Sequence, residues 1–307
     1  MNIISTTEWN GIFPAVMTQF HENLELDLDG TYQHICHLID SGCKGIVMLG
    51  TLGENTSLSI NEKSEVIKTA INAAKSRVPV ICGIAEYTTN EAIERSEMAQ
   101  KNACSGLMVL PPMVYKCDQR ETLVYFHTIA KSVQLPIMIY NNPIAYGVDI
   151  TPEMFIDLSH EKKIVAIKES SEDPRRLVDI KNLVGNRFIL FCGVDDVLIE
   201  SLVLNAKGWV GGLVNAFPEE AVKMFQLATT GEWEKARKFY EWFMPLLHLD
   251  TKPKLVQYIK LCMSLTGLGN EYVRPPRLQV EGKERETIKM LVKKALETKH
   301  LLPNFKL

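Results

Sequence analysis

Lys168 and Tyr140 are the side chains of this 307-residue chain that best suit covalent chemistry. Lys168 ends the apolar run at 163–168, and Tyr140 lies near the end of the run at 136–141. An amine that is partly buried at a strand exit has a lowered pKa and can form a Schiff base with a carbonyl substrate. A lysine whose stem packs while its ammonium stays in water is the alternative interpretation. A tyrosine hydroxyl nearby could relay protons, or could be only the hydrogen-bonded tip of a core residue.

Turns that follow other apolar runs carry candidates for substrate binding. The turn GTLGE at 50–54 contains two glycines, which allow backbone N–H groups to approach a ligand carboxylate. A carboxylate after the run at 78–82 could act on a substrate hydroxyl or amine, or could only cap the next helix. We interpret the two aspartates at 195–196 as helix caps. The candidate substrate-binding residues are Gly50, Leu52, Gly53, Glu86, Tyr115 and Gly211.

One pattern of elements repeats along the first 230 residues. A short apolar run is followed by a turn and then by a longer stretch with helical periodicity. Most runs are continuously apolar, as is typical of parallel strands buried on both faces, and their spacing leaves room for a crossover helix. Eight such runs occur, at 12–17, 44–49, 78–82, 105–110, 136–141, 163–168, 187–192 and 208–213.

Eight strand–helix units are the number that closes a (β/α)8 TIM barrel, and a doubly wound sheet is the alternative. Capping-box patterns at 59–62 and 88–91 predict helix starts between the strands. After residue 230 the sequence predicts helices alone, near 232–247, 252–267 and 283–298. We therefore expect a catalytic α/β barrel over 1–230 and a C-terminal helical extension over 231–307 that packs on it. In such a barrel the strand exits form the active site.

Composition and charge exclude several classes of partner. The net charge is −3, so neither a nucleic-acid groove nor a polybasic membrane surface is indicated. No apolar run approaches the roughly 18 residues that span a bilayer, and the first ten residues lack an export-signal pattern, so we expect a cytoplasmic protein. The seven cysteines form no CxxC and the histidines no HExxH, so no metal site is expected.

Four motifs together resemble the dihydrodipicolinate synthase/N-acetylneuraminate lyase superfamily of Schiff-base-forming barrel enzymes. They are GTLGE at 50–54, YNNP at 140–143, IKES at 167–170 and GVDD at 193–196, and the similarity extends from about residue 11 through residue 300. The resemblance implies that Lys168 is the Schiff-base lysine, Tyr140 the proton-relay tyrosine and Thr51 a hydroxyl connected to that tyrosine. It also implies a homotetramer that is a dimer of dimers.

Three departures from the dihydrodipicolinate synthases are visible. The stretch PIAYG at 143–147 lacks the arginine that binds the carboxylate of their semialdehyde substrate. Leu52 stands where they carry a second hydroxyl, and Tyr115 is what remains of their tyrosine pair. These differences disfavour the lysine-biosynthesis reaction.

Whole segments of the chain are similar to the bacterial 1-pyrroline-4-hydroxy-2-carboxylate deaminases of hydroxyproline degradation. The segments are AEYTT at 85–89, MVLPPMVYK at 108–116, YNNPIAYGVD at 140–149, VNAFP at 214–218 and LLHLDTKPKLVQYIK at 246–260. This similarity implies a small cyclic imine carboxylate as substrate. Lys168 would open the ring as a Schiff base, water would leave from C4 with help from Glu86, and hydrolysis would release ammonia and 2,5-dioxopentanoate. No metal or organic cofactor is needed, because the iminium itself is the electron sink.

Other functions remain compatible with the same residues. A pyruvate-dependent class I aldolase, acting on sialic acid or a 2-keto-3-deoxy sugar acid, would share Lys168 and Tyr140. Dihydrodipicolinate synthase is a further alternative, although the expected arginine is missing. A barrel kept only as a binding or regulatory protein is disfavoured because Lys168, Tyr140 and Thr51 are all present.

Overall fold

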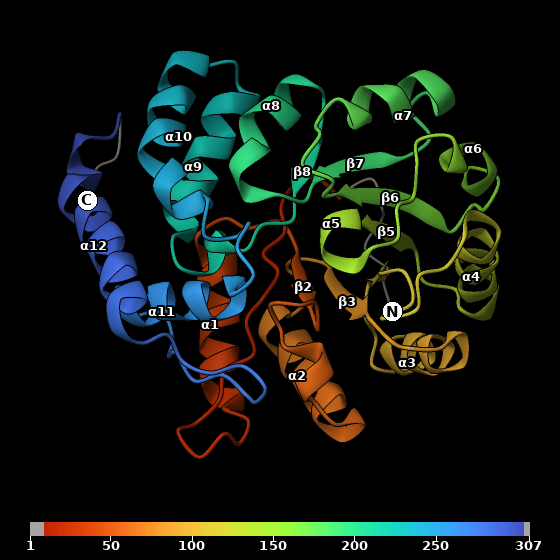
Figure 1. Cartoon of the computed structure of the whole chain (residues 1–307), viewed down its shortest axis with the longest axis horizontal. Helices are drawn as coiled ribbons and strands as arrows, with labels where there is room; N and C mark the ends of the chain where they lie inside the picture. Colours follow the sequence, from red (N-terminus) through yellow and green to blue (C-terminus); the bar gives the residue numbers. More distant parts are fainter. Residues whose placement is uncertain (1–8, 304–307) are drawn as a thin grey trace.

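The computed structural model describes residues 9–303, and within them a single parallel sheet closes into a barrel surrounded by helices (Figure 1). The sheet has the order β1-β8-β7-β6-β5-β4-β3-β2, and a parallel bridge between Ala15 and Val47 joins its two ends. This is the predicted TIM barrel and not a doubly wound sheet. Its strands are β1 (Gly11–Ile12), β2 (Ile46–Met48), β3 (Val80–Ile84), β4 (Gly106–Val109), β5 (Ile137–Asn141), β6 (Ile164–Glu169), β7 (Ile189–Cys192) and β8 (Gly208–Trp209).

Two strands are shorter than the predicted runs at 12–17 and 208–213. Strand β1 ends two residues before Pro14, which has no N–H to donate to a sheet. Beyond β8, the N–H groups of Gly212 and Leu213 donate to the carboxylate of Asp195 and not to a neighbouring strand. The apolar runs therefore continue past the sheet into the rim of the barrel, where they leave backbone free to line a cavity.

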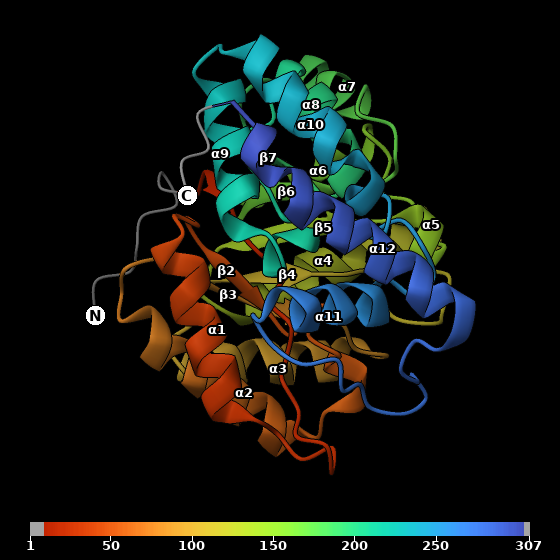
Figure 2. The ribbon, with the colours of Figure 1, turned by 90° about the vertical axis from the view of Figure 1, so that its left-hand side faces the viewer.

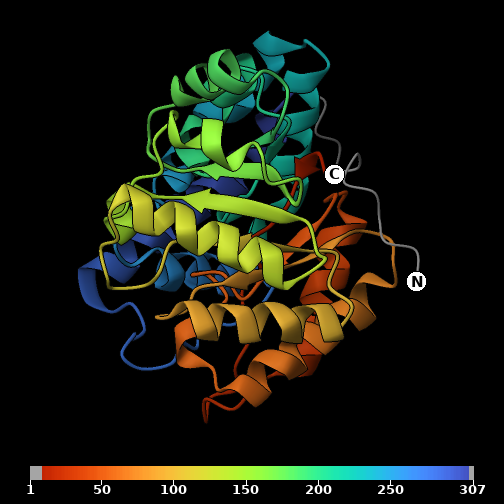
Figure 3. The same ribbon diagram turned by 90° about the vertical axis from the view of Figure 1, so that its right-hand side faces the viewer.

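Helices cover the outside of the barrel (Figure 3). The predicted capping boxes are confirmed at α2 and α3, where Ser59 and Thr88 each exchange hydrogen bonds with the glutamate three residues later. The sequence therefore predicted these two helix starts, but not the capping box that Asp118 and Glu121 form at the start of α4. The helices of this layer are α1 (Leu28–Asp40), α2 (Ile60–Ala74), α3 (Thr89–Lys101), α4 (Gln119–Ser132), α5 (Pro143–Tyr146), α6 (Met154–Leu158), α7 (Arg176–Val184), α8 (Leu198–Val203) and α9 (Pro218–Thr229).

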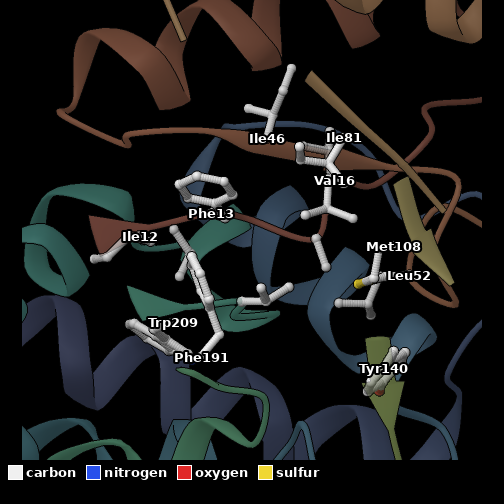
Figure 4. Packing of buried hydrophobic residues seen from close by; sticks show 14 of the residues in the cluster. Ile12, Phe13, Val16, Ile46, Leu52, Ile81, Met108, Tyr140, Phe191 and Trp209 are labelled. Atoms are coloured by element: carbon white, nitrogen blue, oxygen red, sulfur yellow. The ribbon is translucent and has the colours of Figure 1, made fainter. Parts of the chain in front are cut away.

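Aromatic side chains pack together around β1, β7 and β8. The rings of Phe13 and Phe191 pack edge to face with centroids 5.2 Å apart, and Trp209 lies beside Phe191 (Figure 4). A Cβ on Gly208 would lie 2.2 Å from the Phe191 ring, so this packing requires glycine there. Leu52 and Met108 lie nearer Tyr140 (Figure 4). The packed core therefore extends up to Tyr140, one of the candidate catalytic residues.

Three helices of the tail lie along one side of the barrel (Figures 1 and 2). They are α10 (Trp233–Leu247), α11 (Leu255–Thr266) and α12 (Gly282–Thr298), close to the predicted ranges. Trp242 of α10 packs against Phe217, which precedes α9, with ring centroids 6.2 Å apart. The division of the chain at residue 230 stays a prediction. Within residues 9–303 no helix is both long and apolar enough to cross a membrane. Residues 1–8, on which the prediction of no export signal partly rests, lie outside the described residues.

A fully buried ion pair ties the tail to the turn after β2. Lys260 of α11 lies 2.8 Å from Glu54, and neither side chain has any exposed surface. The second oxygen of Glu54 accepts the backbone N–H of Arg274 at 3.0 Å, while Lys260 also donates to the carbonyl of Tyr272 at 2.6 Å. Glu54 itself has a positive φ of 52°, a strained conformation for a non-glycine residue. These contacts hold the backbone at 50–54 in one conformation.

Glu54→Gln is expected to destabilise the protein by about 3–5 kcal/mol, because it leaves the Lys260 ammonium buried without its counter-ion. Urea unfolding followed by circular dichroism measures this loss. The double variant Glu54→Gln/Lys260→Met removes both charges and should recover a large part of it. Equal stability of Glu54→Gln and the unsubstituted protein would show that the pair does not hold the tail to the turn.

Candidate active site

A cavity of about 470 Å³ opens at the carboxyl ends of the strands. Its wall is formed by the residues that follow β2, β5, β6, β7 and β8, together with the loop between α10 and α11. Lys168, Tyr140 and the turn at 50–54 therefore line one cavity, as expected for residues at the strand exits of a barrel. The lining includes Gly50, Thr51, Leu52, Met108, Tyr140, Asn142, Ala145, Tyr146, Lys168, Ser170, Glu172, Gly193, Gly212, Asp250 and Lys252.

Lys168 is buried at the end of β6, with its ammonium 3.9 Å from the centroid of the Tyr140 ring. Burial lowers the pKa of this amine, and the neighbouring Asp250 and Asp195 act in the opposite direction when they are ionised. A lowered pKa leaves more of the amine neutral, and the neutral amine is the form that attacks a carbonyl or an imine. The geometry thus suits the nucleophilic interpretation of Lys168 and not that of a solvated surface lysine.

Gly193, directly after β7, makes room for the lysine. A Cβ at this position would lie 2.7 Å from Cγ and 2.8 Å from Cε of Lys168, and 2.0 Å from the hydroxyl of Ser170. The GVDD motif at 193–196 therefore has a steric role as well as a polar one.

A chain of hydroxyl groups lies beside the amine. Thr51 and Tyr146 are 2.5 Å apart at their oxygens, and the Tyr146 ring packs edge to face on Tyr140 at 5.7 Å. The Tyr140 oxygen accepts a hydrogen bond from Asn142 at 3.2 Å. Burial raises the pKa of both tyrosines, so both hold their protons at neutral pH. Thr51 thus meets Tyr140 through Tyr146, a residue to which the sequence assigned no role.

Four of the predicted substrate-binding residues lie outside this cavity. Glu86 forms an ion pair with Lys63 at 2.9 Å under the loops after β3, which occupies the carboxylate expected to assist the leaving hydroxyl. Tyr115 is exposed and donates to Glu121 in a separate hollow. Gly53 packs on the backbone of Leu49, and Gly211 backs onto the indole of Trp209. Gly50 and Leu52 do line the cavity.

Asp195 differs from its prediction as a helix cap. It is fully buried and accepts hydrogen bonds from the Trp209 indole at 2.9 Å and from the N–H groups of Gly212 and Leu213. Burial raises its pKa to about 6, although these donors favour the charged form. Asp195 therefore fixes the backbone after β8 and places a negative charge behind the lysine.

The charged lining of the cavity comes partly from residues that the sequence analysis missed. Its cations are Lys168 and Lys252, and its acids are Glu172 and Asp250. Helix α5 contributes Ala145 and Tyr146 and contains no arginine. Asp250 and Lys252 belong to the tail, where no strand exit marks them, so a rule based on strand exits does not find them. Among residues 9–303, no group of three or more histidine, cysteine, aspartate or glutamate side chains is arranged to hold a metal ion.

Comparison with known proteins identifies relatives along almost the whole chain. The model of the Dihydrodipicolinate synthetase family matches residues 8–295. The 4-hydroxy-tetrahydrodipicolinate synthase of Kosmotoga olearia is 32% identical over 287 residues, which cover 92% of this chain and 96% of that protein. The synthase of Methanopyrus kandleri is 30% identical over 298 residues, covering 95% and 97% of the two chains.

Solved structures share the same architecture. YagE, a prophage protein of the dihydrodipicolinic acid synthase family from Escherichia coli K12, was solved in complex with pyruvate and superposes with a TM-score of 0.88. It is 28% identical, and the match covers 94% of this chain and 99% of YagE. A dihydrodipicolinate synthetase-like protein from Pseudomonas aeruginosa, also 28% identical, covers 93% and 99% of the two chains with a TM-score of 0.89.

Gly193→Ala is expected to abolish covalent trapping at Lys168 while the barrel stays folded, because the new methyl occupies the space of the lysine side chain. The measurement is the mass of the protein after incubation with pyruvate and borohydride. Val203→Ala, at an exposed residue of α8, is the control and should be trapped normally. Normal trapping in Gly193→Ala would contradict the steric role of Gly193.

Proposed function

The chain belongs to the Dihydrodipicolinate synthetase family of Schiff-base class I lyases, and from that premise we propose that it deaminates 4-hydroxy-1-pyrroline-2-carboxylate. The observation that carries the choice of substrate is the cavity lining, in which Ala145 and Tyr146 stand where a substrate-binding arginine would be expected, and two acids, Glu172 and Asp250, accompany Lys168 and Lys252. A substrate with one carboxylate and a hydroxyl or amine at its far end fits such a wall better than a substrate with a second anionic group.

In this mechanism the turn at 50–54 binds the substrate carboxylate through its backbone, next to Lys168. The neutral amine of Lys168 adds to C2 of the imine, and cleavage of the C2–N bond opens the ring and leaves a Schiff base on the lysine. The iminium makes the C3 proton acidic, and its loss gives an enamine. Tyr140, linked through Tyr146 to Thr51, carries protons to and from the reacting atoms.

The enamine then expels the C4 hydroxyl as water, and tautomerisation turns the C5 amine into an imine. Hydrolysis at C5 releases ammonia, and hydrolysis at C2 frees Lys168 and releases 2,5-dioxopentanoate. One molecule of water is consumed overall, and the iminium on Lys168 supplies the electron sink throughout.

A second candidate is a pyruvate-dependent condensation or aldol cleavage. Its support is direct, since the relatives named above are 4-hydroxy-tetrahydrodipicolinate synthases and YagE was solved with pyruvate. The names of relatives favour this candidate, whereas the lining around α5 favours the deaminase. Both reactions use the same Schiff base, so only the products separate them. The cytoplasmic location expected from the sequence stays a prediction.

Incubation with 4-hydroxy-1-pyrroline-2-carboxylate, made in situ by oxidising cis-4-hydroxy-D-proline, is expected to release ammonia and 2,5-dioxopentanoate in equal amounts. Lys168→Ala should lose several orders of magnitude in rate because the covalent route is gone. Release of pyruvate from a 2-keto-3-deoxy sugar acid or sialic acid, or condensation of pyruvate with a semialdehyde, in the absence of ammonia release would instead favour the second candidate.

We also propose that the chain forms a homotetramer, a dimer of dimers, with one contact at the loops after β3 and β4. Exposed apolar side chains gather there around a hollow beside α4, namely Tyr87, Tyr115 and Val124 (α3 and α4 lie together in Figure 3). Val114, 80% exposed, holds a positive φ of 73° that is strained for a β-branched residue. Large exposed apolar groups of this kind mark interaction surfaces.

Val124→Glu is expected to split the tetramer into smaller species, because it places a charge in this apolar contact. Sedimentation velocity measures the change. Leu278→Glu, at an exposed apolar residue of the tail, is the control and should leave the assembly intact. If the tetramer survives Val124→Glu, the contact between subunits does not lie at this hollow.

A further inference from the structure

Asp250 lies in the loop between α10 and α11, which brings the tail to the mouth of the barrel. Its carboxyl group lines the same cavity as Lys168 and Tyr140. A Cβ on Gly212 would lie 2.3 Å from one Asp250 oxygen, so the carboxyl rests directly on the backbone after β8. The acid and the amine therefore reach one cavity from two different parts of the chain.

The surroundings of Asp250 favour its protonated form. Burial raises its pKa well above the usual range, and the nearby charges of Asp195 and Asp196 raise it further. Lys168 opposes this shift, and among charged groups Asp250 has the largest influence on the Lys168 amine. Within residues 9–303, no ion pair within 4.0 Å joins the two side chains. Both side chains line the cavity that a substrate would occupy.

The other acids near the strand exits are less suited to act on a substrate held by Lys168. Glu86 is paired with Lys63 outside the cavity, and Glu172 is exposed at the rim. Asp195 has its oxygens occupied by the indole of Trp209 and by backbone N–H groups. Asp250 combines a place in the cavity wall with a raised pKa, which is what a general acid at neutral pH requires.

We propose that Asp250 is a catalytic residue that donates a proton to the C4 oxygen of the Schiff-base substrate as water leaves. The proposal rests on the proposed deaminase function and gives Asp250 the role that the sequence assigned to Glu86. Its basis is the placement of the carboxyl group against Gly212, in the wall that faces Lys168.

The step balances as follows. The lone pair on the Lys168 nitrogen forms the C2=N bond, the C2=C3 pair moves to C3=C4, and the C4–O bond breaks with both electrons on oxygen. Asp250 gives its proton to that oxygen, so that water departs and a carboxylate remains. Water then returns a proton to this carboxylate, and the C5 proton leaves to water during the tautomerisation that leads to the imine, so that the protons balance. No external oxidant or reductant enters the step.

The test uses full-length Asp250→Asn, which keeps the shape of the side chain and removes its acidic proton. Release of ammonia from 4-hydroxy-1-pyrroline-2-carboxylate should fall about 10²–10⁴-fold, the range for the loss of a general acid. Borohydride should still trap substrate on Lys168, now with the hydroxyl retained, so that the adduct is one water heavier than the dehydrated one. Glu241→Gln, which removes a surface carboxylate of α10 that pairs with Arg237, is the matched control and should keep full activity.

A substrate with a better leaving group separates chemistry from folding. The 4-fluoro analogue expels fluoride, a much weaker base than hydroxide, and needs little help from an acid. Asp250→Asn should therefore process it within about tenfold of the unsubstituted enzyme. An equal loss on both substrates would mean that Asp250 positions the cavity and is not the acid.

The outcomes also separate this proposal from the proposed function. If the unsubstituted enzyme releases ammonia and Asp250→Asn does so at the same rate, the role of Asp250 is overturned while the deaminase function stands. If the unsubstituted enzyme releases no ammonia from the hydroxy-imine, the deaminase function is overturned and the role of Asp250 in water loss falls with it.

Discussion

The desolvation of one amine is the constraint on which this site depends. Lys168 sits on the face of Tyr140, buried and without a carboxylate within ion-pair distance in the described chain. Burial disfavours the ammonium form and so favours the neutral amine. The amine stays neutral only if no carboxylate lies close enough to pair with it. Gly193 makes room for the Lys168 side chain. The Asp195 carboxylate accepts hydrogen bonds from the indole of Trp209 and from the backbone after β8, and it forms no ion pair with the lysine in the described chain. Both neighbours therefore help to keep the Lys168 amine buried and unpaired by a carboxylate.

The second requirement is a rigid turn opposite the lysine. Thr51 hydrogen-bonds to Tyr146 from the turn at 50–54, and Glu54 of that turn has a positive φ and forms the buried pair with Lys260. A buried ion pair seldom adds much net stability when compared with an apolar pair, yet breaking it is costly. It is therefore well suited to fix a conformation. The position of the Thr51 hydroxyl is thus tied to Lys260, a residue of the tail helix α11.

The sequence predicted the parts of the protein that follow local rules. Strand spacing predicted the barrel, capping residues such as Ser59 predicted helix starts, and the motifs around Tyr140 and Lys168 predicted the lining of one cavity. It misplaced Glu86, because nothing in the sequence shows that Lys63 of the preceding helix pairs with it. It missed Asp250 for a related reason. The place of that residue depends on how the tail packs against β8, a contact between distant segments that leaves no periodic pattern.

Two separate parts of the chain line the cavity, namely the barrel and the loop between α10 and α11. The barrel carries Lys168, whereas the tail carries Asp250 and Lys252, which line the same cavity. A change in the loop can alter what lies opposite the amine without disturbing the strands that hold it. A chimaera carrying a foreign loop would therefore present different side chains to the cavity while Lys168 keeps its place in β6.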